Sequence, residues 1–350
     1  MKIKKLVWIA FFALLISAGA ATLYIMQSLR GLENNVVVKQ DEMLLTVPAG
    51  TGRIAMEQLL IKNNLLKQGD YFQILLKVKP ELSQFKAGTY RLTKGMTLRD
   101  VLLLIKSGKE AQFTIRFIEG SRLSDWQAIF DKAPELKIVA NGMESDKLRQ
   151  EIGMKPEITH LEGWFAPDTY HYTAGTTDIA ILKRAYQQME KTLEEEWLKR
   201  DSDLPYKSAY EMLIMASIIE KETGIDAERT KVASVFVNRL KRNMRLQTDP
   251  TVIYGLGDKY RGTIYRSDLN GYTPYNTYQI DGLPPTPIAM PSVASIKAAA
   301  HPADTRYLYF VADGTGGHKF STTLAEHIKP SHNTDAYNKD NYEKQQIYCY

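Results

Sequence analysis

The chain of 350 residues has almost no cysteine: the single one, Cys349, stands one residue from the C-terminus. One cysteine cannot form a disulfide within its own chain, so the stability of the fold must come from packed cores. The six histidines show no HExxH or other metal-ligand spacing. No metal site and no cofactor are therefore predicted.

The chain also lacks a dense block of lysine or arginine, and its net charge of +5 is mild. No nucleic-acid partner is predicted on that basis. The charge is compatible with an acidic polymer or a membrane surface and selects neither. The length allows two domains plus an anchor, and the hydrophobic content of 44% is ordinary for a globular protein.

Long apolar runs are absent except at the N-terminus, where lysines precede an uninterrupted run over Leu6–Met26. This run is long enough to span a bilayer and longer than the usual signal-peptide core, which favours an uncleaved signal anchor at residues 1–30. Cleavage after Ala18–Ala21 is the alternative. The lysines ahead of the run place the N-terminus in the cytoplasm. We therefore expect a single-pass membrane protein with the residues after about Arg30 outside the cytoplasm, which in a bacterium is the periplasm or the cell-wall space.

The first folded region is predicted at residues 42–108. Strands are expected at Met43–Val47 and Ala87–Leu92, with helices at Arg53–Asn63 and Asp70–Val78 between them. The order strand, helix, helix, strand resembles LysM-type glycan-binding modules and predicts a LysM-like subdomain. A small spacer domain with its own core is the alternative.

The second region, residues 112–332, is predicted to be a larger α+β domain with a helical core. Thr177 is the expected N-cap of a long helix to about Lys199, and Asp226 the expected cap of a later one. The predicted strands lie at 113–117 and 307–311, and the main helices at 177–199, 208–222, 226–240 and 292–300. Residues 333–350 are polar and tyrosine-rich, as in a tail.

The helix over Ser208–Glu222 is unusual because it carries a carboxylate on its apolar side. On a period of 3.6 residues, Leu213, Ala216, Ser217 and Glu220 share one face. An ionised carboxylate is costly to bury unless it is paired or becomes neutral. A protonated glutamic acid in a partly apolar cleft is what cleavage of a glycosidic bond needs as general acid. A buried salt bridge to Arg229 or Arg239 is the alternative.

Glycosidases of the usual kind need a second carboxylate, and Glu222 does not supply it. It lies about 200° around the helix from Glu220, so the two side chains diverge. A hydrolase would then need Asp168 or Asp249 as base or nucleophile, although Asp249 just before Pro250 also suits a helix cap. A lytic transglycosylase needs only one carboxyl group, which first protonates the leaving oxygen and then deprotonates the 6-hydroxyl of the same sugar.

Several segments in a fixed order resemble the endolytic murein transglycosylases of the YceG-like family. The resemblance covers nearly all of the chain between the anchor and about His327, and it departs slightly at Ala166, where a larger apolar residue is expected. The segments are Glu162–Tyr170, Ala216–Thr223, Val232–Leu240, Leu246–Tyr254, Tyr275–Tyr278, Gly282–Pro285 and Ala298–Pro302.

The resemblance implies an inner-membrane anchor, a LysM-like subdomain and a catalytic domain whose glutamate aligns with Glu220. It also implies cleavage within nascent peptidoglycan strands that leaves 1,6-anhydro-N-acetylmuramic acid ends and limits glycan length. Gln247, Asp249, Tyr275 and Asn276 are the further candidates for the cleft, with Gln247 or Asn276 orienting the N-acetyl group or stabilising the transition state.

Two rival functions remain open at this point. A muramidase would hydrolyse the same bond and leave reducing ends. A non-catalytic wall-binding scaffold that recruits peptidoglycan synthases would use the anchor and the LysM-like region, with Glu220 as a salt-bridged core residue.

Overall fold

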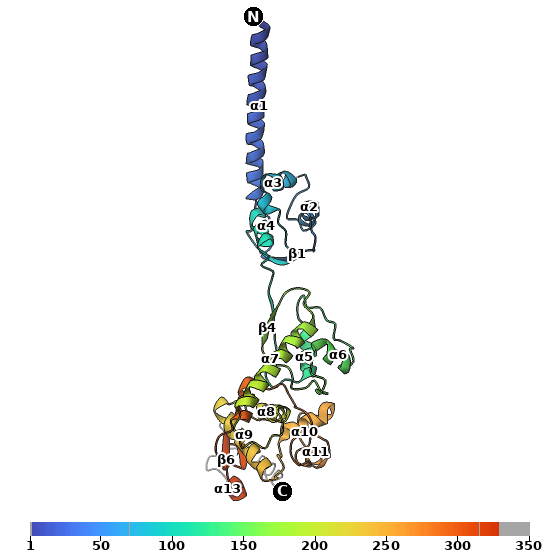
Figure 1. Ribbon diagram of the computed structural model, residues 1–350, viewed down its shortest axis with the longest axis vertical. Helices are drawn as coiled ribbons and strands as arrows, with labels where there is room; N and C mark the ends of the chain where they lie inside the picture. Colours follow the sequence, from blue (N-terminus) through green and yellow to red (C-terminus); the bar gives the residue numbers. More distant parts are fainter. Residues whose placement is uncertain (1, 70, 315, 329–350) are drawn as a thin grey trace. The chain divides into compact units, whose positions relative to one another are not determined.

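The computed structural model describes residues 2–69, 71–314 and 316–328, and it confirms a mixed α+β protein (Figure 1). The chain is divided into two compact units. The first unit ends at Phe113 and also includes His171–Gly175, whereas the second comprises Thr114–Tyr170 and continues from Thr176. The predicted tail, residues 333–350, lies outside the described residues.

Helix α1, Lys2–Glu33, is the apolar N-terminal helix that the sequence predicts. Its part from Lys5 to Glu33 is long and apolar enough to cross a membrane, a test that a signal sequence also passes. The last turns of α1 belong to the first unit. Leu29 is part of the hydrophobic core of that unit, and the buried Glu33 forms ion pairs with Lys79 and Arg99.

The first unit has the predicted order of strand, helix, helix and strand. Strands β1 and β2 pair antiparallel, with Leu45 opposite Tyr90. The likeness to LysM modules stays a prediction. The elements after α1 are β1 (Glu42–Val47), α2 (Arg53–Lys62), α3 (Phe72–Val78), the short 3-10 helix η1 (Pro80–Leu82), β2 (Gly88–Thr93) and α4 (Leu98–Ser107).

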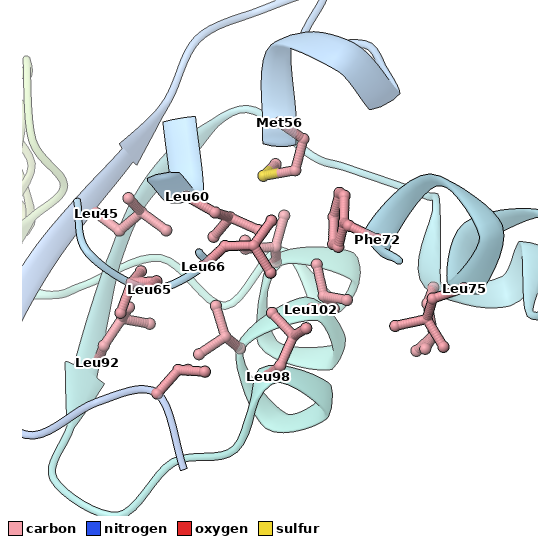
Figure 2. Packing of buried hydrophobic residues seen from close by; sticks show 14 of the residues in the cluster. Leu45, Met56, Leu60, Leu65, Leu66, Phe72, Leu75, Leu92, Leu98 and Leu102 are labelled. Atoms are coloured by element: carbon pink, nitrogen blue, oxygen red, sulfur yellow. The ribbon is translucent and has the colours of Figure 1, made fainter. Parts of the chain in front are cut away.

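Helix α4 shows why this unit packs as it does. Its buried residues recur at helical spacing and form one apolar face toward the sheet. Thr97 and Asp100 form a capping box at its start, and Gly108 ends it in the left-handed conformation with φ of 72°. Figure 2 shows the resulting core, in which leucines from the strands and α4 meet Met56 and Phe72.

The second unit is largely helical. Its short strands form two separate two-stranded sheets, β3 with β4 and β5 with β6. From β3 onward the elements are β3 (Phe113–Arg116), α5 (Leu123–Phe130), α6 (Ser145–Ile152), β4 (Thr169–Tyr172), α7 (Asp178–Lys199), α8 (Ala209–Glu222), α9 (Asp226–Lys241), α10 (Asp249–Leu256), η2 (Gly257–Lys259), α11 (Arg266–Asn270), α12 (Val293–Ala300), β5 (Tyr309–Ala312), β6 (His318–Ser321) and α13 (Leu324–Ile328).

Helix α8 is the centre of this unit. All residues from Met212 to Ile219 are buried, so the helix is covered on every side rather than along one stripe. Helix α12 packs closely against it, helped by the small residues Ala298–Ala300, which are nearly inaccessible. The Ser217 hydroxyl donates to Ile214 O and accepts from Ile288 N at 3.0 Å, so this buried polar group is satisfied.

Several local predictions are confirmed and two are wrong. Thr177 caps α7, its hydroxyl accepting from the Ala180 N–H. Asp226 and Asp249 are not caps: each is the first residue of its helix, and Ile225 and Thr248 hold the cap positions. An acidic residue in the first helical turn is still favoured because it faces the positive end of the helix dipole.

Candidate active site

Glu220 lies on the last turn of α8, and 7% of its side chain is exposed. The apolar residues before it on α8 hold the helix inside the unit, so the carboxyl group is carried to the edge of the core. This position agrees with the predicted placement on the apolar side of the helix. The surroundings of its two oxygens decide what it can do.

One oxygen, Oε2, accepts hydrogen bonds from three donors at the start of α12. The donors are the Ser292 N–H at 2.9 Å, the Ser292 hydroxyl at 2.5 Å and the Ser295 hydroxyl at 2.7 Å. Ser292 is also the N-cap of α12, since its hydroxyl oxygen accepts from the Ser295 N–H. The positive end of the α12 dipole therefore faces the Glu220 carboxyl group.

The other oxygen, Oε1, faces the Arg229 guanidinium. Nη2 of Arg229 lies 3.8 Å from Oε1, which is within ion-pair range but too long for a hydrogen bond. Arg229 is in the first turn of α9, and 10% of its side chain is exposed. The sequence offered Arg229 or Arg239 as a salt-bridge partner. Arg239 instead donates to backbone carbonyls, Leu308 O at 2.7 Å and Leu246 O at 3.1 Å.

A turn of backbone passes beside Glu220 at Gly120. A Cβ atom at Gly120 would lie 3.6 Å from Cγ of Glu220, and the φ of 72° favours glycine there. Reciprocal backbone bonds between this turn and Met290 fix it, from Gly120 N to Met290 O and from Met290 N to Ser121 O. The Lys221 ammonium group donates to Gly120 O at 3.0 Å.

Glu222 points into different surroundings, as the helical spacing predicted. Its Oε1 accepts from the Thr248 hydroxyl, and it lines a cavity of about 410 Å³ together with Gln247, Asp249 and Tyr278. Burial raises the pKa of Glu222 to about 7, and the nearby Asp249 adds to this against the Thr248 bond. Burial also raises the pKa of Asp249, which accepts from the Tyr278 hydroxyl at 2.7 Å. Two of the predicted cleft residues thus lie together, beside Glu222.

A second cavity, of about 260 Å³, contains Tyr275 and Glu162. Burial raises the pKa of Glu162 to about 7, although its oxygens accept from Leu123 N at 3.1 Å and from the Tyr254 hydroxyl at 3.3 Å. The Tyr254 and Tyr275 ring centroids are 4.8 Å apart. Gly120 lies beside Glu220 and Leu123 beside Glu162, and three residues span at most about 10 Å. Glu162 therefore belongs to the same region of the unit as Glu220.

Asn276 is fully buried. Its amide nitrogen donates to the carbonyl groups of Asp268, Leu269 and Gly271, and its oxygen accepts from Tyr278 N. These bonds hold the loop that precedes it. Among the described residues, none of Gln247, Asp249, Tyr275 and Asn276 makes a hydrogen bond or ion pair with Glu220.

Asp168, which a hydrolytic reading would use as base or nucleophile, is exposed. Its carboxylate accepts from Thr169 N and from the Gln188 amide at 3.0 Å. These contacts stabilise the start of β4 beside α7.

Sequence reasoning missed the residues that hold Glu220 most directly. Ser292 carried a recognisable signal as the start of a helix, but nothing local to Ser292 or Ser295 pointed to a carboxylate 72 and 75 residues earlier. Glu162 stood only at the start of one segment of the family resemblance, Glu162–Tyr170. Its burial, which raises its pKa, depends on Leu123 and Tyr254, which are distant in sequence.

The fold and site together define an α+β protein with an apolar N-terminal helix and a buried acid at the end of its central helix. The chain belongs to the YceG-like family, whose family model matches residues 45–333.

Named relatives and a solved structure agree with this membership. The chain is 35% identical over 327 residues to a Bacillus subtilis protein named endolytic murein transglycosylase, covering 89% of each chain. It is 26% identical to a Streptococcus pneumoniae protein of the same name, over 92% of this chain and 64% of that one. A crystal structure of a putative YceG-like protein from Listeria monocytogenes matches with a TM-score of 0.52 and 28% identity, covering 83% of this chain and 99% of that chain.

Proposed function

We propose that this protein is an endolytic lytic transglycosylase of peptidoglycan with Glu220 as its single catalytic acid and base. It cleaves the β-1,4 bond between N-acetylmuramic acid and N-acetylglucosamine within nascent glycan strands. The observation that carries the proposal is a nearly buried carboxyl group with one oxygen held by three donors and the other without a hydrogen bond from any described residue. The relatives named endolytic murein transglycosylase support it.

The reaction uses Glu220 twice. Protonated Glu220 donates its proton to the glycosidic oxygen while the bond from C1 of the muramic acid to that oxygen breaks. The resulting carboxylate then takes the proton of the 6-hydroxyl on the same sugar, and O6 bonds to C1. Atoms and charge balance without water: the original proton of Glu220 ends on the leaving sugar, and the proton of the 6-hydroxyl restores the acid form of Glu220. The product has a 1,6-anhydro end, which cannot be extended from that sugar and so limits strand length.

The donors of α12 and the Arg229 cation stabilise the negative charge that this proton transfer leaves on Glu220, whose side chain is nearly closed to water. Donors fixed in advance, such as the start of α12, cost no reorganisation when charge develops on the carboxyl group. The free oxygen is the one that can approach the substrate. Among the described residues, neither Glu222 nor Asp249 forms a hydrogen bond with Glu220, which favours one-acid chemistry over the two-carboxylate hydrolysis of a muramidase.

Substrate contacts are assigned to the two cavities near α8 and α10. Gln247 and Asp249 line one cavity, and Tyr275 lines the other with Glu162. Tyrosine rings beside amides and carboxyl groups suit sugars, which have apolar faces and a rim of hydroxyl groups. Asn276 has an indirect role, because its hydrogen bonds hold the segment that positions Tyr275. The LysM-like region binds the strand or serves as a spacer.

The products of the wild-type enzyme test the chemistry. Uncrosslinked glycan strands are digested and the new ends are identified by mass spectrometry. Anhydro ends, lighter by one water than reducing ends, are expected on fragments from the interior of strands. Reducing ends would assign a muramidase, and release of single disaccharides from strand ends would contradict endolytic cleavage.

The proposed location is the inner membrane, with the N-terminus in the cytoplasm and the catalytic unit in the periplasm. Cys349 is the only cysteine and serves as a natural reporter. A membrane-impermeant maleimide should label it in intact spheroplasts. In the control chain with Cys349→Ser and Lys2→Cys, labelling should appear only after permeabilisation. The opposite pattern would contradict this orientation.

A further inference from the structure

We infer that the two oxygens of Glu220 have separate roles, Oε2 as the fixed anchor and Oε1 as the proton carrier, with Arg229 as a positioning residue that assists release of the proton from Oε1. The inference rests on the proposed function and assigns the atoms and the cation through which it operates.

The donors at the start of α12 determine which oxygen carries the proton. The backbone N–H of Ser292 can only donate, so Oε2 must accept from it. The Ser292 hydroxyl oxygen already accepts from the Ser295 N–H, which leaves its own proton directed to Oε2. The Ser295 hydroxyl adds a third contact to the same atom. A proton on Oε2 would displace these donors, so the acid proton belongs on Oε1.

Arg229 is placed to act on Oε1 without occupying it. Nη2 lies 3.8 Å away, a separation that gives electrostatic attraction but no hydrogen bond. Oε1 therefore keeps a lone pair free for the substrate. A direct hydrogen bond from the guanidinium would compete with the 6-hydroxyl group for that lone pair in the second half of the reaction.

The remaining bonds of Arg229 do not explain its burial. Nη1 forms an ion pair with the exposed Asp226 within α9. Nε has no hydrogen-bond partner among the described residues. Buried donors without partners are unfavourable and uncommon in folded proteins. The free-energy cost of burying this guanidinium is offset by its attraction to the negative charge that appears on Glu220 when the proton leaves.

Arg229 thereby makes the first half of the reaction easier. The attraction exists for the carboxylate and not for the neutral acid, so it favours transfer of the proton from Oε1 to the glycosidic oxygen. Other charges near Glu220 come from Lys221 on α8, which is bound to Gly120 O, and from Asp226 on α9. The groups of α12 that contact Glu220 are uncharged, a backbone N–H and two hydroxyl groups. Arg229 is thus the cation with the shortest approach to Oε1 in the described part of the chain.

The experiment compares Arg229→Gln and Arg229→Lys with the wild type, using Arg242→Gln as control. Arg242 directly follows the same helix, is exposed, and lies about 20 Å from Arg229 along the helix axis.

The rate of formation of anhydro ends is measured against pH and substrate concentration. Removal of the cation takes away the attraction that favours the carboxylate over the neutral acid, so release of the proton from Oε1 is slower. Arg229→Gln should therefore lower kcat by about tenfold to hundredfold with KM changed less than about threefold, and shift the alkaline limb of the kcat profile to higher pH.

Arg229→Lys keeps the charge and should restore at least part of kcat and most of the alkaline limb, while Arg242→Gln should match the wild type. If Arg229→Gln does not fold, the inference is tested with Arg229→Lys alone. An alkaline limb like that of the wild type, with kcat within about tenfold of the wild-type value, supports the inference. An unchanged pH profile in folded Arg229→Gln, or a loss confined to KM, would overturn it. Failure of the proposed function is recognised separately, by reducing ends in the wild-type digest or by anhydro ends formed with Glu220→Gln.

Discussion

Glu220 and Glu222 stand two residues apart on one helix and have unlike partners. Glu220 is held by serine donors and faces a guanidinium, whereas Glu222 accepts from a threonine beside another carboxyl group. The helical rotation between them produces this separation. In the proposed mechanism Glu220 is the residue that reacts with the substrate. Glu222 is a buried acid, and its ionisation destabilises the folded state.

Glu222 gives a pH dependence of stability. Its pKa is about 7 in the folded chain because of burial, against about 4.3 in an unfolded chain. The folded state thus holds a proton that the unfolded state releases, so this contribution is complete below about pH 4.3 and is lost as the pH rises through about 7. Glu222→Gln, which is neutral at every pH, should raise the free energy of unfolding of the second unit by about 1–3 kcal/mol at pH 8 and leave it unchanged at pH 4.

Urea unfolding at the two pH values measures this effect. The exposed Glu151→Gln serves as the control and should change stability at neither pH. An equal gain for Glu222→Gln at both pH values would show that shape, and not ionisation, is responsible.

Asn276 illustrates a candidate whose described contacts are structural. Removal of its side chain leaves buried carbonyl groups of the Asp268–Gly271 loop without their donor. Asn276→Ala should therefore lower the free energy of unfolding by about 2–4 kcal/mol. The exposed Asn270→Ala is the control, expected within about 0.5 kcal/mol of wild type. Normal stability with lost activity would instead support direct contact of Asn276 with the substrate.

At the scale of elements, the site is a junction between the end of α8 and the start of α12. Ser292 caps α12 and bonds Glu220, so the same residue begins one helix and orients the proposed catalytic group on the other. The small residues Ala298–Ala300 allow α12 to lie close to α8. The spacing between these two helices therefore sets the position of the Glu220 carboxyl group.

An enlarged residue in this junction should affect both stability and rate. Ala299 is fully buried, and Ala299→Leu should cost about 1–3 kcal/mol of stability and lower kcat by about tenfold or more. The exposed Ala294→Leu on the same helix should leave both close to wild type. Thermal unfolding and initial rates measure the two effects. Full activity in a folded Ala299→Leu chain would contradict the role of the spacing.

Local signals predicted most of the helices and little of the site. The cap at Thr177 and the periodicity of α8 depend on residues within a few positions, so sequence patterns are enough. The bond from Ser292 to Glu220 depends on tertiary packing and has no local pattern. The short strand β4, four residues long, is stabilised by pairing with β3, which is distant in the sequence, rather than by its own residues.

For the molecule as a whole, helix α1 and the first unit form one structural piece. Leu29 is 4% exposed within the core of that unit, and Glu33 pairs with Lys79 and Arg99. The end of α1 is therefore part of the first unit, without a loose stalk between them.

This connection predicts where the anchor can be removed. A chain that begins at Gln27 should keep the first unit intact. A chain that begins at Val36 loses the burial of Leu29 and the Glu33 ion pairs, and its first unit should be less stable by about 2–4 kcal/mol. Urea unfolding of the two soluble chains gives the comparison. Equal stability would show that the last turns of α1 do not belong to the unit.

The central claim, that Glu220 is the acid and base of a lytic transglycosylase, is tested most directly with Glu220→Gln. Glutamine keeps the shape and can still accept from Ser292 and Ser295, but it cannot transfer the proton. We expect a Tm within about 2 °C of wild type and no anhydro ends above background in digested glycan strands, measured by mass spectrometry. Anhydro ends at the wild-type rate would contradict the claim. Loss of activity together with destabilisation of about 3–5 kcal/mol would instead indicate a buried ion pair in a non-catalytic scaffold.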